Sequence, residues 1–424
     1  MKTRNPWLWV PTLYFTEGIP YFVVNNISVI LFKRMGMGNA DMALWTSLLY
    51  LPWLIKPLWS PFVDVMKTKR WWIVTMQILL SLLFALLAFS LPSTTGSEVS
   101  LYSLTIICFW ITAFASSTHD IAIDGFYMLA LSGGEQSLFA GIRTTFYRLA
   151  NLFVQGGLVV VAGLLEARGD VPRAWKLTIL STAILWALFT LYHLWALPAP
   201  GADTPRKHSG GILRESGRSF VSFFKKKGIW AGILFMLLYR LPEAFALKIV
   251  PAFLVDSPEM GGMGLDTVSF GLVNNTVGVV GIVTGGILGG ISVSRRGLRR
   301  CLWPMAASLA LPCAVYLWMA MDTSLPLWLV GGCVAVEQFG YGFGFTAYTL
   351  YMIFLSDGAF KTSHYSLCTA FMAASMMLPG LVAGYLQESM GYPLYFTLVL
   401  VCSLATAAAV LLARRKLPEG FGRK

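Results

Sequence analysis

The chain has 424 residues, of which 56% are hydrophobic and only 12% are charged, and its formal net charge is +12. A soluble domain normally carries about 25% charged residues, so this composition excludes an ordinary soluble protein and favours a polytopic membrane protein. The six cysteines show no CxxC or Cys/His ligand spacing. This excludes a recognisable disulfide framework or zinc site, and we expect the cysteines to pack as small apolar residues.

Apolar segments recur along the whole chain. A spanning helix needs about 20 mostly apolar residues, and on this criterion the sequence predicts an all-α integral membrane protein with twelve transmembrane helices. They are expected at approximately residues 6–32, 42–63, 71–91, 101–130, 138–165, 174–197, 229–255, 267–293, 300–320, 325–355, 363–387 and 393–413. The first apolar run is too long for the core of a cleavable signal peptide, so we expect it to be retained as a span.

The longest polar interruption covers residues 198–228 and separates six predicted spans from six. It predicts an N-terminal bundle at 1–197, a cytoplasmic linker at 198–228 and a C-terminal bundle at 229–424. The later part of the linker mixes phenylalanines with basic residues, and two interpretations stay open: an interfacial amphipathic helix, or a solvated loop whose charges set topology.

Lysines and arginines are concentrated at both termini, in the linker and in alternate loops. The positive-inside rule therefore places both termini in the cytoplasm. Topology accounts for the net positive charge, so a nucleic-acid partner is not needed, and membrane lipids are the expected surroundings.

The two halves repeat at an offset of 224 residues, which is the distance from Tyr127 to Tyr351 and from Met128 to Met352. Because each half has six predicted spans, equivalent segments keep the same orientation in the membrane. This parallel repeat is typical of the two six-helix bundles of major facilitator transporters.

Ionisable residues lie inside the predicted spans, where each costs at least about 2.5 kcal/mol at a helix centre on insertion scales. Such residues tend to face a cavity and to carry function. The candidates are Glu17, Lys56, His119, Asp120, Asp124, Arg143, Arg148, Arg240, Glu243, Lys248 and Glu337.

Asp120 and Asp124 are four residues apart and share one face of a helix. Two carboxylates on one face predict a proton-coupling site, for which Glu17 and Glu243, each beside a proline or glycine, are reserve candidates. A metal site is not expected, because His119 points away from these carboxylates and no cysteine lies nearby. For His119 we favour a hydrogen-bonded structural role.

Arg143 and Tyr147 share a face of the next predicted span, and Arg148 lies on its flank. Arginine presents a planar fork that matches carboxylates, so these residues are predicted to bind an anionic group of a substrate. The predicted substrate-binding residues are Arg143, Tyr147, Arg148, Lys56, Arg240 and Glu337. The alternative is that the intramembrane acids and bases only neutralise one another and fix helix packing.

Three stretches of the first half resemble the AmpG-like branch of the major facilitator superfamily. They are "WLIKPLWSPFVDVMKTKRWW", containing Lys56 and Asp64; the Asp-Ile and second Asp of Asp120 to Asp124; and "FYRLANL", containing Tyr147 and Arg148. The resemblance implies proton-driven import through the bacterial inner membrane by alternating access, with an anhydromuropeptide as the expected substrate. Siderophores and other small metabolites are carried by related permeases and form the alternative.

Two other function classes are disfavoured. A membrane-embedded enzyme would need a nucleophile or metal constellation, and the sequence has no GxSxG, HExxH or P-loop motif. A sensor would more naturally carry a large soluble output domain. We therefore predict a transporter that is not an enzyme, has no cofactor, works as a monomer, and has a small molecule and protons as partners.

Overall fold

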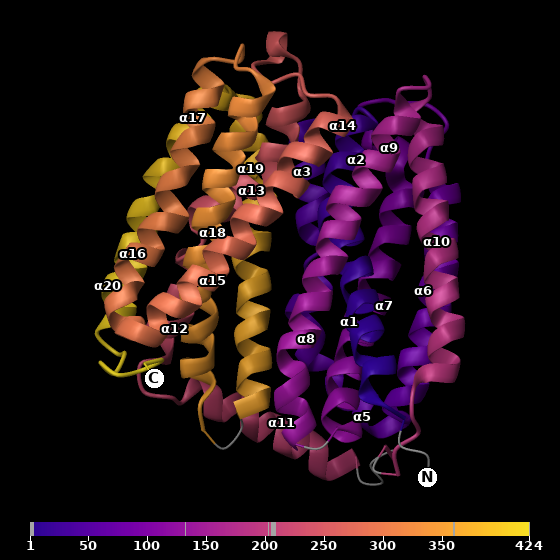
Figure 1. Ribbon diagram of the computed structural model, residues 1–424, viewed down its shortest axis with the longest axis vertical. Coiled ribbons are helices and arrows are strands. Elements are labelled where there is room, and N and C mark those ends of the chain that lie inside the picture. Colours follow the sequence, from indigo (N-terminus) through magenta and orange to yellow (C-terminus); the bar gives the residue numbers. More distant parts are fainter. Residues whose placement is uncertain (1–3, 132, 202, 205–208, 359–360, 424) are drawn as a thin grey trace. The chain divides into compact units, whose positions relative to one another are not determined.

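The computed structural model describes residues 4–131, 133–201, 203–204, 209–358 and 361–423, and every regular element among them is helical (Figure 1). The predicted all-α class is therefore confirmed. Packing divides the chain into two compact units. The first contains Met1–Met37 and Ile55–Arg214, and the second contains Gly38–Leu54 and Glu215–Lys424.

The first unit is built mainly from long apolar helices. Its helices are α1 (Val10–Phe22), α2 (Ser28–Arg34), α5 (Ser60–Met66), α6 (Lys69–Ser90), α7 (Ser103–Ala130), α8 (Gly133–Asn151), α9 (Val159–Glu166) and α10 (Val171–Ala196). Helix α6 packs along both α7 and α10, and α1 packs along α8 (Figure 1). Gly18 makes the α1–α8 approach possible, because a Cβ there would lie 2.7 Å from the Cβ of Ala150.

The second unit contains a larger set of helices. They are α3 (Asn39–Leu48), α4 (Leu51–Ile55), α12 (Ile229–Leu238), α13 (Leu241–Val255), α14 (Thr267–Phe270), α15 (Gly278–Arg296), α16 (Leu298–Ala310), α17 (Ala314–Met321), α18 (Leu327–Ser356), α19 (Lys361–Val401) and α20 (Ser403–Arg414). Within α19, Gly391 has φ of 72° and separates two helical stretches. This break falls between the last two predicted spans.

Helices α15 and α18 have the most extensive contact in the second unit, and glycines on both sides allow it (Figure 1). A Cβ at Gly285 would lie 2.1 Å from the carbonyl oxygen of Phe339, and one at Gly342 would lie 2.1 Å from that of Ile282. Small residues let helix backbones approach closely in a membrane, where packing rather than water exclusion holds helices together.

Helix α3 packs against α19 within the second unit. Asn39 joins the two helices, since its amide nitrogen donates to Gln387 Oε1 at 2.6 Å and to the hydroxyl of Tyr392 at 3.1 Å. Gly384 brings the backbones together, because a Cβ there would lie 2.2 Å from the carbonyl oxygen of Asn39. The division into bundles at 1–197 and 229–424, which was inferred from the repeat, stays a prediction. The packing units differ from it in that Gly38–Leu54 belongs to the second unit.

Eight helical segments of the described chain are long and apolar enough to cross a membrane, and the predicted number of twelve stays a prediction. These segments are Pro6–Arg34, Lys69–Ser90, Val99–Ala130, Thr145–Glu166, Val171–Ala196, Thr267–Arg296, Leu298–Met321 and Ser363–Arg414. The expected span at 42–63 is broken into α3, α4 and α5 with a 3₁₀ turn at Lys56–Leu58. Pro57 lies in that turn and has no backbone N–H to continue an α-helix.

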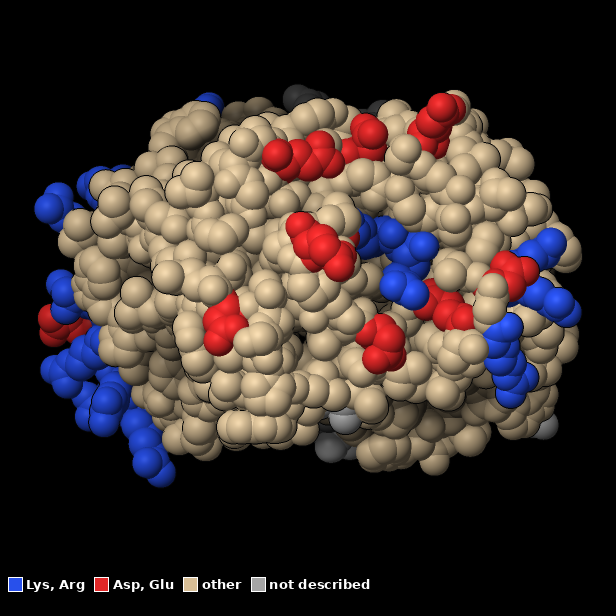
Figure 2. All heavy atoms as spheres, turned by 90° about the horizontal axis from the view of Figure 1, so that it is seen from above, with Lys and Arg blue, Asp and Glu red and all other residues tan. Residues whose placement is uncertain are grey.

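Figure 2 shows where charged side chains lie at one end of the helices. Seen from above, Asp and Glu side chains are scattered over the surface, and Lys and Arg side chains lie in the middle and at the sides of the view (Figure 2). This is the end where α2 and α9 finish, and where Arg34 forms an ion pair with Glu166 at 2.8 Å. The predicted cytoplasmic position of both termini is not tested by these features.

The later part of the predicted linker forms a helix, α11 (Ser209–Phe224). Phe223 on this helix is buried and stacks on Phe371 of α19, whereas Phe220 and Val221 are exposed. A helix with one buried and one exposed apolar side fits the amphipathic interpretation, and its position at a membrane interface stays a prediction.

Candidate functional site

A mostly buried ion pair lies within the first unit. Lys56 Nζ in the 3₁₀ turn lies 2.6 Å from Asp120 Oδ2 of α7, and both side chains are mostly buried. Lys56 was predicted to bind substrate. In the structure it forms an ion pair with Asp120, which was predicted as a proton-coupling residue. The two charges therefore neutralise each other.

Glu17 of α1 is buried, and its carboxyl group interacts electrostatically with that of Asp120. The second oxygen of Glu17, Oε2, is buried without a hydrogen-bond partner among the described residues. An ionised carboxylate with an unpaired buried oxygen would be costly, so the geometry favours a protonated Glu17.

Asp124, one turn along α7 from Asp120, has different partners. Its Oδ1 lies 3.4 Å from Nη1 of Arg143 and 3.4 Å from the hydroxyl of Tyr14. The guanidinium of Arg143 also donates to the Tyr14 hydroxyl at 3.2 Å. Arg143 lies 5.3 Å from the ring centre of Tyr14 and 5.2 Å from that of Tyr127, so cation–π contacts hold it on two sides.

The Asp124–Arg143 pair is more open than the Lys56–Asp120 pair. The side chains of Arg143 and Asp124 are 38% and 48% exposed, against 16% and 18% for Lys56 and Asp120. The two carboxylates on one helix face thus lie in different surroundings, one closed around a lysine and one accessible beside an arginine.

Tyr147 and Arg148 follow on α8. The ring of Tyr147 lies 5.2 Å from that of Phe22, and Tyr147 is half-buried. Arg148 is exposed and makes no hydrogen bond or ion pair with the residues that the structure describes. Arg143, one of the three residues predicted on this helix, contacts Asp124 of the acidic cluster. The side chain of Asp64, part of the sequence motif around Lys56, lies outside the described side chains.

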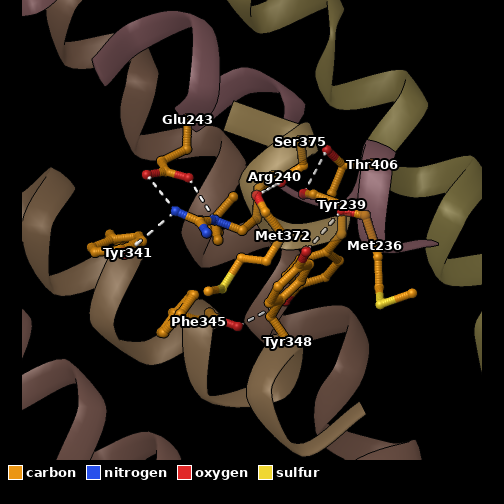
Figure 3. A network of polar contacts seen from close by, with 12 residues as sticks. Met236, Tyr239, Arg240, Glu243, Tyr341, Phe345, Tyr348, Met372, Ser375 and Thr406 are labelled. Atoms are coloured by element: carbon orange, nitrogen blue, oxygen red, sulfur yellow. Dashed lines mark hydrogen bonds and ion pairs between the residues drawn. The ribbon is translucent and has the colours of Figure 1, made fainter. Parts of the chain in front are cut away.

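A second charged cluster lies in the second unit (Figure 3). Arg240, at the start of α13, makes two hydrogen bonds to Glu243, with Nε to Oε2 at 2.8 Å and Nη2 to Oε1 at 3.1 Å. Its guanidinium lies 5.5, 4.8 and 5.5 Å from the ring centres of Tyr341, Phe345 and Tyr348. Arg240, predicted to bind substrate, and Glu243, predicted as a proton site, therefore form one buried pair.

Glu337 of α18 is buried in the same unit and accepts two hydrogen bonds on Oε2. Tyr316 donates from its hydroxyl at 2.9 Å and Gln338 from its amide at 2.9 Å. These neutral donors satisfy the carboxyl group without a positive charge.

His119 differs from the prediction. It is fully buried and packs edge-on to Trp186 at 5.9 Å, but neither ring nitrogen has a hydrogen-bond partner among the described residues. The expectation of a hydrogen-bonded histidine is wrong, because the neighbouring face of α10 presents an aromatic ring. Two other histidines do make hydrogen bonds: His193 contacts Gln77 and Thr12, and His364 contacts Ser222.

Two site residues were not predicted. Tyr14 bridges Asp124 and Arg143, and Tyr127 covers the arginine. A sequence signal existed for both: Tyr14 precedes Glu17 by three residues and Tyr127 follows Asp124 by three, which places each on the same helix face as an acid.

Two units of packed apolar helices with buried ion pairs are typical of a membrane transporter. The Major Facilitator Superfamily profile matches residues 12–366, and the chain belongs to this superfamily. It is therefore a transporter and not an enzyme.

The relatives agree with this class. The chain is 25% identical over 413 residues to the anhydromuropeptide permease of Escherichia coli strain K12, covering 96% of this chain and 79% of the permease. It is 24% identical over 396 residues to an uncharacterized Haemophilus influenzae protein, covering 90% and 88%.

Solved structures show the same fold. A nucleoside transporter aligns with a TM-score of 0.72 at 14% identity, covering 98% of this chain and all of that one. A D-xylose–proton symporter aligns with a TM-score of 0.71 at 14% identity, covering 98% of both chains. The similarity to the Escherichia coli permease confirms the resemblance to the AmpG-like branch of the superfamily.

Proposed function

We propose that this chain imports a bulky, polar, anionic solute of the anhydromuropeptide type through the bacterial inner membrane, driven by protons and working by alternating access. The substrate type is supported by the similarity to the Escherichia coli permease. Arg143 and Arg148 on α8 supply positive charge for such a solute, with Tyr147 as a wall.

The proposal of proton coupling rests on one observation: Glu17 is buried near Asp120, and its Oε2 has no hydrogen-bond partner among the described residues. Three ionisable groups, Glu17, Asp120 and Lys56, meet at one point and together hold one more acid than base. A proton on Glu17 neutralises the surplus. Its departure leaves a buried negative charge that must be matched by a movement of the protein or of a cation, which is the physical requirement for coupling.

The test uses the full-length protein in proteoliposomes that are presented with radiolabelled anhydromuropeptide. An inside-alkaline pH gradient should drive accumulation, and a protonophore should abolish it. A sodium gradient at equal pH should give no accumulation. Accumulation driven by sodium alone would refute proton coupling, and no uptake under any gradient would refute the substrate.

A matched pair of variants tests whether proton-driven accumulation depends on Glu17. Glu17→Gln should accumulate no more solute than protein-free liposomes. Glu259→Gln, which makes the same chemical change at an exposed position, should behave like the unmodified protein. Equal accumulation by both variants would separate Glu17 from coupling.

A further inference from the structure

Lys248 is a buried lysine that takes no part in either charged cluster. It lies on α13 with 1% of its surface exposed. Its ammonium donates to the hydroxyl of Thr46 on α3 at 3.1 Å and lies 5.2 Å from the ring centre of Tyr50. All three residues belong to the second unit.

No carboxylate of the described chain forms an ion pair with Lys248. Lys56, by contrast, has Asp120 at 2.6 Å. An ammonium has three N–H donors, and Thr46 satisfies one of them. The Thr46 hydroxyl in turn donates to the carbonyl of Met42 at 2.7 Å, so it is an acceptor for the lysine and has no further proton to give.

A second unsatisfied donor lies beside this lysine. The hydroxyl of Ser47 is buried and has no hydrogen-bond partner among the described residues. A Cβ at Gly380 of α19 would lie 2.1 Å from Ser47 Oγ and 3.1 Å from Lys248 Cε. The serine hydroxyl and the lysine stem therefore both pack against one point of α19, where glycine has no side chain that could supply an acceptor.

The balance of donors and acceptors at this point favours a negative partner. Elsewhere on the α3–α19 contact the balance is complete, since Asn39 finds Gln387 and Tyr392, and Tyr392 donates to Asp256. At Lys248 the ammonium has one acceptor, Thr46, for its three N–H donors, and the Ser47 hydroxyl has none among the described residues. A buried charge without a partner is strongly destabilising, and one anionic group would satisfy both donors.

We propose that Lys248 and Ser47 form a binding site for a carboxylate of the transported solute, contributed by the second unit. This inference deepens the proposed function and rests on it for the identity of the solute, but not for the existence of the site. The carboxylate accepts from the ammonium and from the serine hydroxyl, and Tyr50 covers the ammonium from the other side.

The first experiment measures anion binding without transport. Apparent Tm of the purified full-length protein is followed while sodium acetate, a bare carboxylate, is titrated, with acetamide as its neutral counterpart. A ligand that binds the folded state raises Tm in a saturable way. Acetate should do so in the unmodified protein and in Lys225→Met, a matched change of an exposed lysine, and should not in Lys248→Met. Acetamide should have no effect in any of them.

The Lys248→Met variant should remain folded, because replacing an uncompensated buried charge by an apolar side chain of similar length removes a desolvation cost. Ser47→Ala should weaken acetate binding while keeping part of it. An equal, saturable Tm rise in Lys248→Met, or no saturable rise in the unmodified protein, would overturn the site.

The second experiment separates the site from the proposed function. In proteoliposomes, Lys248→Met should raise the half-saturating concentration of anhydromuropeptide by about 10-fold or more, the loss expected for one charge-assisted hydrogen bond. Lys248→Arg should retain more affinity. Unchanged half-saturation in Lys248→Met would overturn the role in transport. If the unmodified protein binds acetate at Lys248 but takes up no anhydromuropeptide, the proposed substrate fails and the anion site stands.

Discussion

Arg240 and Glu243 face each other across one turn of α13 and make two parallel hydrogen bonds, while three aromatic rings of α18 cover the guanidinium (Figure 3). Their side chains are only 6% and 5% exposed. Two-point contact with a carboxylate is specific to arginine, because lysine lacks the planar fork. The pair therefore behaves as a single neutral unit inside the second bundle of helices.

Glu243→Gln should destabilise the protein by about 3 kcal/mol or more, because it leaves the Arg240 charge buried and unpaired. The measurement is the apparent Tm in detergent and the yield of folded protein. Glu419→Gln is the matched control, since its pair with Arg299 is exposed and contributes at most about 1 kcal/mol. Equal stability of the two variants would show that the buried pair is not structural.

Asp124→Asn should abolish gradient-driven accumulation of the solute and leave exchange at equal pH partly intact, if Asp124 takes part in proton coupling. The reason is that an amide keeps hydrogen bonds to Tyr14 and Arg143 but cannot change its protonation state. Asp120→Asn should also lower folded yield, because it deprives Lys56 of its partner. Unchanged accumulation in both variants would exclude the pair from coupling.

Arg148→Ala should leave the yield and apparent Tm of the protein within about 0.5 kcal/mol of the original stability, because Arg148 is exposed and has no partner among the described residues. Its half-saturating solute concentration should rise if the guanidinium binds the solute. Arg148→Lys keeps the positive charge but loses the planar guanidinium. Its affinity for the solute should therefore lie between that of the unmodified protein and that of Arg148→Ala. Normal affinity in a folded Arg148→Ala would remove this residue from the site.

Gly285→Ala should destabilise the α15–α18 contact by about 1–3 kcal/mol, since the added methyl meets a backbone oxygen that cannot move independently of its helix. Gly290→Ala on the same helix is the control, because a Cβ there meets nothing within 4 Å. That change should be neutral or stabilising by up to about 1 kcal/mol, from the higher helix propensity of alanine. The measurement is the apparent Tm of both variants. An equal Tm for Gly285→Ala and Gly290→Ala would contradict the predicted steric role of Gly285.

The helical class and the superfamily could be predicted from the sequence because both depend on local properties. Apolar length identifies a span, and the intramembrane motif around Asp120 carries the family resemblance. The exact path of each span could not be predicted. The helix that contains Lys56 breaks into short pieces, and no periodicity rule determines how far a proline-induced break extends.

The candidate site was predicted in part. Four-residue spacing correctly placed Asp120 and Asp124 on one face, which is a local property of a helix. The partner of Asp120 was not predicted, because Lys56 lies 64 residues away and the two meet only through packing. Sequence reasoning also gave Arg148 the same standing as Arg143, and only the orientation of α8 distinguishes the exposed side chain from the paired one.

The packing of α3 against α19 has a consequence for how the chain is made. Asn39 and its partner Gln387 are 348 residues apart, so α3 leaves the ribosome long before α19 supplies Gln387 and Tyr392 to its amide. Asp256, which the same amide also contacts at 3.4 Å, is made earlier. A chain that terminates before α19 therefore lacks two hydrogen-bond partners of Asn39, and incompletely satisfied polar groups are costly in lipid. By this feature of a helix near its beginning, a truncated copy differs from a finished one.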